Sequence, residues 1–363
     1  MIPQDTGQKK TILSLQVIRA FSCIIIYLSH ATRITDPSHW AVSVFFVLSG
    51  FVMTYSYWER APVADAINAA KFSVKKIKPL FLLHIIMLLL GLIREVIMNP
   101  VLWRRDLTYL MIAVPLLQSW FPTAYQALNS VDWYLSVTLF LYFVFPFILS
   151  FLKKQQYSCN HSVFLVVGVI FLQFLIGAAV GSIFPRFIKW ITYCFPIYRL
   201  GDFFIGSILG YLFKNRRESE GSCGRTTFVE VSIALASVVS WYLARTVLKE
   251  YKWVTYTCLY VPSSACLIYV FAKEEGMLSR IITNKITLSF ASLSAYFFLI
   301  HRQVLFWIDD AAGFLFNKSM NGWVLAIIAF PFAYYCMKLY LYIERRWISQ
   351  KEYCRPKKDD CSF

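Results

Sequence analysis

Apolar windows of about 20 residues alternate with short polar connections along most of the chain. A helix of that length crosses a bilayer, because the hydrocarbon core is about 30 Å thick and a helix rises about 1.5 Å per residue. Ten such windows are expected near residues 12–30, 40–58, 79–97, 133–151, 162–183, 197–213, 227–247, 252–271, 287–308 and 322–343. The pattern predicts an all-α, polytopic membrane bundle of about ten transmembrane helices, with one domain over residues 1–363 and a tail from about residue 344.

Residues 107–121 form an apolar stretch that does not fit this scheme. The stretch is shorter than a full span and contains Pro115, so it is typical of a re-entrant or interfacial segment. Counting it as an eleventh span would move Lys153 and Lys154 to the other side of the membrane. We therefore expect ten spans, with both termini on one side.

Composition and charge place the chain in a membrane. The sequence is 58% hydrophobic and 15% charged, which excludes an ordinary soluble domain. In a soluble protein, a net charge of +16 would suggest nucleic acid as the partner. In this chain, the Lys and Arg residues instead gather on one side of the expected membrane spans. With the N-terminus inside, roughly 22 Lys and Arg residues fall on the inner side and about 8 on the outer side. We expect a multi-pass protein of the cell (inner or plasma) membrane, with cytoplasmic termini, the lipid bilayer as its surroundings and no nucleic acid partner.

The familiar signatures of metal and nucleotide chemistry are not found in the sequence. The nine cysteines are scattered and have neither zinc-ligand nor disulfide spacing. No P-loop or Gly-x-Ser-x-Gly elbow occurs, which argues against ATP-driven transport and Ser hydrolase chemistry. The candidate chemistry therefore depends on polar side chains buried among apolar residues, without a metal.

Arg19 and His30 are the first such side chains, and both lie in the first apolar window. Eleven positions are close to three helical turns, so the two side chains share one helix face about 16 Å apart along the axis. An arginine inside a membrane costs roughly 2.5 to 3.5 kcal/mol even on insertion scales, which makes it a candidate functional residue. His30 is suited to general base chemistry near neutral pH, and a solvated interfacial histidine is the alternative.

Arg199 and Asp202 form a second candidate pair inside an apolar window. A separation of three residues places them on one helix face, where they can form an ion pair. The spacing favours a structural salt bridge over a catalytic role.

Two motifs in the first hundred residues together resemble the membrane acyltransferase 3 family. The first is the Arg-x10-His run from Arg19 to His30, and the second is Phe-Phe-Val-Leu-Ser-Gly-Phe from Phe45 to Phe51. Read without the resemblance, Ser49 and Gly50 are small residues that let two helices approach closely.

The resemblance extends to two later segments, with departures. Phe72-Ser-Val-Lys-Lys-Ile-Lys-Pro79 is similar to an arginine-containing family stretch implicated in handling acyl-CoA, and here the resemblance points to Lys75, Lys76 and Lys78. Lysines attract phosphates as point charges but lack the bidentate fit of arginine. The segment 294–301 is similar to the family's Ser-Tyr-x-x-Tyr-Leu-Ile-His motif and keeps His301, although Ala295 and Phe298 replace two tyrosines. Thr138 stands where the family usually has Glu, which excludes a catalytic carboxylate there.

The resemblance implies a function as well as a fold. Members of the family move acetyl or other short acyl groups from acyl-CoA to hydroxyls of glycans or glycolipids, often in lipopolysaccharide or exopolysaccharide modification. We therefore expect an O-acetyltransferase that uses cytoplasmic acetyl-CoA and a glycan or lipid-linked glycan acceptor. His30 would be the base, Arg19 would hold the donor or shape the channel, and His301 would orient the acceptor hydroxyl or the base. An acyl-histidine intermediate also remains open.

Two other classes of protein fit parts of the pattern. A transporter or flippase of glycolipids or acyl-carrying molecules would use the same buried polar path without chemistry. An inactive, acyltransferase-like sensor would explain the departures from the family motifs, but the intact Arg19 and His30 argue against it.

Overall fold

The computed structural model describes residues 11–155, 157–216 and 223–353, and these fold into twelve α-helices without any strand. The all-α prediction is therefore confirmed for this part of the chain. The helices are α1 (Leu13–Thr32), α2 (Asp36–Tyr57), α3 (Ala66–Met98), α4 (Trp103–Ala113), α5 (Trp133–Gln155), α6 (Cys159–Ile183), α7 (Pro196–Lys214), α8 (Cys223–Arg245), α9 (Val261–Phe271), α10 (Met277–Ile282), α11 (Lys285–Phe316) and α12 (Gly322–Tyr353). Short helical turns join some of them: η1 (Pro100–Leu102), η2 (Gln118–Trp120), η3 (Pro185–Phe187), η4 (Trp190–Cys194) and η5 (Val254–Cys258). The tail expected from about residue 344 continues α12 to residue 353, and residues 354–363 lie outside the described part.

Nine helical segments in the described residues are long and apolar enough to cross a membrane. They correspond to nine of the ten windows expected from the sequence. The window near 197–213 corresponds to α7, which is helical throughout but less apolar because it contains Arg199 and Asp202. Both of those side chains are fully buried, so α7 is enclosed by other helices and does not present its charges to lipid.

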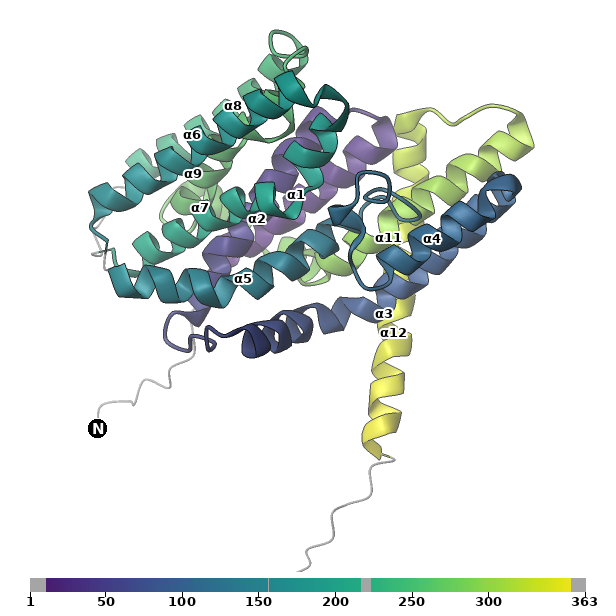
Figure 1. The fold of residues 1–363 in the computed structure, drawn as a ribbon, viewed down its shortest axis with the longest axis horizontal. Coiled ribbons are helices and arrows are strands. Elements are labelled where there is room, and N and C mark those ends of the chain that lie inside the picture. The colour runs from purple at the N-terminus through teal and green to yellow at the C-terminus, as the bar shows by residue number, and fades with distance from the viewer. Residues whose placement is uncertain (1–10, 156, 217–222, 354–363) are drawn as a thin grey trace, which may run out of the picture.

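The helices α2 and α7 form the most closely packed pair of the bundle. Three glycines permit this, because a Cβ on Gly50 or Gly206 would overlap the backbone of the opposite helix at Phe203 or Val47, and one on Gly210 would lie 2.6 Å from the Phe51 carbonyl oxygen. Close approach through small residues is a common way to pack membrane helices. In Figure 1, α1 and α2 (purple) lie in the middle of the view, between the α6–α9 group and the α11–α12 pair.

Arg199 and Asp202 tie this central pair to neighbouring elements. Arg199 Nη1 lies 2.6 Å from Asp202 Oδ2 and 3.3 Å from Ser43 Oγ of α2, while its Nε donates to the Tyr193 carbonyl. Gln173 of α6 donates to the other Asp202 oxygen at 2.8 Å. The ion pair expected from the three-residue spacing is present, and its contacts support a structural role.

The helix α3 begins at a capped end and extends well past the bilayer thickness. The Asp65 side chain accepts from the Asn68 backbone N–H and from its side-chain amide, and these hydrogen bonds hold the pKa of Asp65 below its usual value. The helix has 33 residues, or about 50 Å, compared with about 30 Å of hydrocarbon. One end of α3 therefore reaches beyond the apolar layer.

Residues 103–132 fold back against α3. The helix α4 has 11 residues, about 16 Å, which is half of what a span requires. The turns after it enter the bundle, where Ser136 Oγ of α5 donates to the Leu116 carbonyl and the Gln118 amide donates to the Asp132 carbonyl at 2.9 Å. The apolar stretch 107–121 therefore does not form an eleventh span. We refer to residues 103–132, which turn back into the bundle, as the re-entrant segment.

Candidate functional site

The Arg-x10-His face of α1 packs along α11 for its full length. Arg19 Nη2 donates to the Ala291 carbonyl at 3.1 Å, and Cys23 Sγ lies 3.4 Å from the Ser294 carbonyl. Two turns further along both helices, His30 Nδ1 lies 2.9 Å from His301 Nε2. Because residue numbers increase together on both sides of this seam, α1 and α11 run in parallel, and the sequence-predicted residues Arg19, His30 and His301 share one interface.

The imidazole rings of His30 and His301 are nearly parallel and lie within hydrogen-bond distance of each other. Their ring planes are only 9° apart, and His301 is fully buried with Tyr27 and Phe297 against it, at ring-centre distances of 6.0 Å each. Nδ1 of His301 makes no hydrogen bond of normal geometry within the described residues, and the carbonyls of Phe297 and Phe298 are the acceptors beside it. We assign the proton of His301 to Nδ1, on the side of these carbonyls, and in this tautomer the lone pair of Nε2 accepts a hydrogen bond from His30 Nδ1–H.

This proton arrangement sets the chemistry that His30 can perform. When Nδ1 of a neutral imidazole donates, Nε2 carries the lone pair. His30 is partly exposed, whereas His301 is not. In this tautomer the free lone pair of the pair is on Nε2 of His30, and the hydrogen bond to His301 orients the His30 ring.

A cavity of about 380 Å³ opens at the Arg19 end of the seam. Its wall includes Arg19 of α1, Ser49 of α2, Lys76 of α3 and Tyr142 of α5, with Ser49 Oγ 3.3 Å from the Tyr142 hydroxyl. Arg19 also donates to Gln16 Oε1 at 2.8 Å, but its Nε has no hydrogen-bond partner in the described residues. A small-molecule site of this size with a few polar groups on an apolar wall is typical of ligand pockets.

The three lysines implied to hold the donor are placed differently. Lys76 lies in the cavity wall, with Nζ 4.6 Å from the centre of the Tyr57 ring. Lys75 and Lys78 are exposed and do not line the cavity. The position of Ser73, an arginine in the family pattern, is buried against α5, where its hydroxyl donates to the Leu139 carbonyl. Lys76 is thus the one lysine of the three with direct access to a ligand in the cavity.

Neither histidine lines the cavity, because an aromatic wall lies between them and it. Phe45, Tyr134 and Phe298 all face the cavity and pack on one another, with ring-centre distances of 5.4 to 5.9 Å. On the far side, the Phe298 ring lies 5.7 Å from that of His301. We refer to these three residues as the aromatic wall. Phe298 thus lies between the cavity and His301, and the sequence spacing gave no sign of this separation.

Sequence reasoning also missed a buried histidine–aspartate pair. His84 Nδ1 lies 2.8 Å from Asp132 Oδ2, and His84 Nε2 lies 3.0 Å from the Ala113 carbonyl oxygen. A carbonyl oxygen only accepts, so Nε2 carries a proton, and a second proton is shared between Nδ1 and the carboxyl group. The pair joins the re-entrant segment to α3. The two residues are 48 positions apart in the sequence, and no sequence motif connects them.

No metal-binding cluster of three or more His, Cys, Asp or Glu side chains occurs within residues 11–155, 157–216 and 223–353. The titratable groups at the seam include the two imidazoles of His30 and His301 and the guanidinium of Arg19. A base at one end of a seam and a cavity at the other suit transfer of a group between two bound molecules.

Comparison with known proteins gives the family of this chain. The profile of the acyltransferase 3 family, described as an acyltransferase domain, matches residues 12–340. No curated protein and no solved structure matches the chain. The matched region contains the α1–α11 seam, the cavity and the aromatic wall. This membrane-bound chain therefore belongs to the acyltransferase 3 family.

Proposed function

We propose that the protein transfers an acetyl group from cytoplasmic acetyl-CoA to a hydroxyl of a cell-envelope or extracellular glycan or glycolipid. The donor binds with its thioester in the cavity at the Arg19 end. The acceptor hydroxyl binds at His30, across the aromatic wall. The observation that carries this proposal is the His30–His301 pair, whose 2.9 Å contact leaves Nε2 of His30 as an oriented base.

In the proposed reaction, the Phe298 ring moves aside and the thioester reaches His30, whose Nε2 takes the proton of the acceptor hydroxyl as the hydroxyl oxygen attacks the thioester carbonyl carbon. The new C–O bond forms, the C–S bond breaks, and the proton passes from His30 to the leaving CoA thiolate. The products are an acetyl ester and free CoA. His301 does not touch the substrates and acts by fixing the orientation and tautomer of His30.

Arg19 and Lys76 are proposed to hold the donor. Both are cationic and lie in the cavity wall, and Arg19 Nε has no protein partner in the described residues. A planar guanidinium can donate to a thioester or amide oxygen, and an ammonium attracts phosphate as a point charge. Lys75 and Lys78, exposed just outside the cavity, are available to the part of CoA that the cavity does not enclose.

The aromatic wall is proposed to separate donor and acceptor until both are bound. A thioester in contact with water at a base is hydrolysed, and exclusion of water prevents such side reactions. Movement of the Phe298 ring would open the shortest route from the cavity to His301.

Release of free CoA from acetyl-CoA tests the proposal. Purified protein in lipid is supplied with crude cell-envelope glycan, and CoA is quantified by chromatography because the nine cysteines would react with thiol reagents. We expect His30→Ala to lose release by about 10²- to 10⁴-fold, the usual contribution of general base catalysis. His161→Gln is the matched control, since His161 is exposed and bonded to Ser158.

The same assay separates this function from a transporter. Release by wild type and by His161→Gln but not by His30→Ala, with acetyl ester on the glycan, supports an acetyltransferase. Equal turnover in His30→Ala and wild type contradicts the assignment of His30. A transporter would move glycolipid without any release of CoA that depends on His30.

A further inference from the structure

Two cationic side chains border the His30–His301 pair and lie outside the reaction path described above. Arg302 directly follows His301 in α11, and its Nε donates to Ser130 Oγ at 3.0 Å. Lys189, just before η4, donates from Nζ to Gln126 Oε1 at 3.1 Å. Both anchors, Ser130 and Gln126, belong to the re-entrant segment, so one segment positions both cations.

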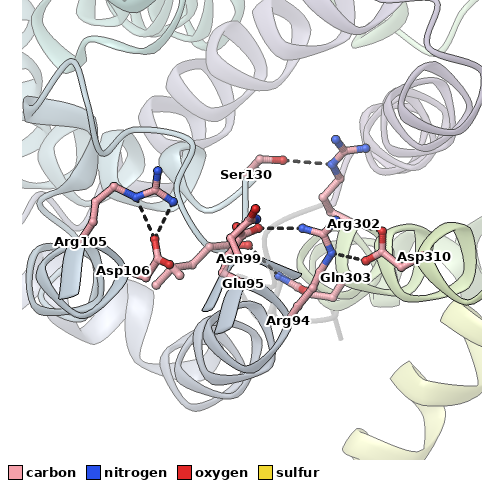
Figure 2. A network of polar contacts seen from close by, with 10 residues as sticks. Arg94, Glu95, Asn99, Arg105, Asp106, Ser130, Arg302, Gln303 and Asp310 are labelled. Atoms are coloured by element: carbon pink, nitrogen blue, oxygen red, sulfur yellow. Dashed lines mark hydrogen bonds and ion pairs between the residues drawn. The ribbon is translucent and has the colours of Figure 1, made fainter. Parts of the chain in front are cut away.

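Neighbouring arginines have acidic partners, whereas Arg302 does not. Arg94 pairs with Asp310 and Glu95, Arg33 pairs with Asp309 at 2.9 Å, and Arg105 pairs with Asp106. Figure 2 shows Arg94 joined to Asp310 by dashed lines, while Arg302 has a single dashed line to the neutral Ser130. Its guanidinium also stacks on Phe306, 3.9 Å from the ring centre.

No carboxylate in the described residues lies within ion-pair distance of Arg302 or Lys189. Asp309 is the acidic residue that acts electrostatically on Arg302. Its carboxylate, however, already accepts hydrogen bonds from Arg33 and from the Met320 backbone N–H. Half-buried cations without a counter-ion are costly, and an anionic ligand relieves that cost.

Both cations act on His30 electrostatically. The cationic side chains close enough to act on His30 are Arg302 and Lys189, and the neutral rings of His301 and His39 also face it. His39 is buried between the rings of Tyr193 and Tyr256, at 4.8 and 5.1 Å, and its Nδ1 has no partner in the described part of the chain. The surroundings of the proposed base therefore favour negative charge and offer unused hydrogen-bonding groups.

We propose that Arg302 and Lys189 form an anion subsite beside His30, and that the acceptor carries a carboxylate or phosphate close to the hydroxyl that is acetylated. This inference rests on the proposed function and adds the chemical class of the acceptor. An acidic sugar would supply a carboxylate, and a lipid-linked glycan would supply a phosphate. Bound at the subsite, either group would place a neighbouring hydroxyl against Nε2 of His30.

The test compares acceptors from which each type of anionic group has been removed in turn. Cell-envelope glycan is used as isolated, after chemical reduction of its carboxylates to neutral hydroxymethyl groups, and after mild acid removal of lipid phosphate. The ratio of kcat/KM for the native over the neutralised glycan is measured for wild type, Arg302→Gln and Lys189→Gln. Arg302→Lys keeps the charge, and Arg104→Gln and Lys249→Gln are matched controls because both residues are exposed.

We expect wild type to prefer the anionic glycan, and we expect that preference to fall about tenfold in Arg302→Gln and in Lys189→Gln. Arg302→Lys should recover most of the preference, and the controls should match wild type. The neutralisation that removes the preference identifies its source, carboxylate or phosphate. Retained binding of acetyl-CoA shows that each variant is folded.

Two outcomes separate this proposal from the proposed function. Equal kcat/KM for native and neutralised glycans, unchanged in both Gln variants, would overturn the subsite and leave the acetyltransferase function standing. Binding of radiolabelled anionic glycan that Arg302→Gln weakens, without any acetyl transfer by wild type, would support the subsite and contradict the proposed function.

Discussion

Replacement of His301 distinguishes a residue that positions the base from one that reacts. In His301→Leu, His30 loses the acceptor for its Nδ1–H, while the apolar surroundings of Tyr27 and Phe297 can still enclose the side chain. In His301→Gln, the amide oxygen can replace Nε2 as acceptor. The two substitutions therefore differ mainly in whether the hydrogen bond to His30 survives.

The hydrogen bond between His30 and His301 sets the expected size of the loss in kcat. A 2.9 Å hydrogen bond between two neutral rings contributes about 1 kcal/mol, which corresponds to about fivefold in rate. We expect kcat to fall about five- to tenfold in His301→Leu and by no more than about half of that in His301→Gln. His30→Ala removes the base itself, with a loss of about 10²- to 10⁴-fold.

The assay is CoA release under saturating acetyl-CoA, with the double variant His30→Ala/His301→Leu included. Because His301 acts through His30, the double variant should be no slower than His30→Ala alone. If His301→Leu were as slow as His30→Ala, His301 itself would take part in the chemistry. If the two losses multiplied in the double variant, the positioning role would be refuted.

Two further predictions concern the aromatic wall and the helix packing. Phe298→Ala should raise acetyl-CoA hydrolysis without acceptor several-fold, because it connects the thioester in the cavity to water at the His30 base, whereas Phe298→Tyr keeps a ring in place. Unchanged background hydrolysis in the Ala variant would contradict a separating role. Gly206→Val should destabilise the protein in detergent by at least about 1–3 kcal/mol, because its side chain meets the backbone of Val47. Gly168→Ala, with no atom within 4 Å of the added Cβ, is the control, and equal thermal stability of the two variants would argue against the close α2–α7 contact.

Much of the architecture follows from the sequence because membrane helices are specified locally. An apolar window of about 20 residues forms a helix whatever its neighbours are, since an unpaired backbone group cannot remain in lipid. Nine expected windows recur as apolar helices, and the tenth corresponds to α7, whose Arg199–Asp202 pair was expected from spacing. The position of Arg19 and His30 on one face also follows from helix geometry alone.

The role of Gly50 shows where local information ends. Its presence in a motif indicated close helix approach, but the sequence does not name the partner helix. The structure identifies it as α7, because the Cβ position of Gly50 faces the backbone at Phe203. Likewise, the re-entrant segment was recognised as too short to span, yet its attachment through His84 and Asp132 depends on residues brought together only by folding.

By itself, the sequence determined the helices, the face shared by Arg19 and His30, and the family motifs that contain His301. The tertiary structure decided which residues these side chains contact. It placed His301 Nε2 against His30 Nδ1, put the aromatic wall between the cavity and the base, and set Arg302 and Lys189 beside the base through Ser130 and Gln126. The physical reason is that helix formation depends on neighbours along the chain, whereas a site depends on distances between helices, which packing sets.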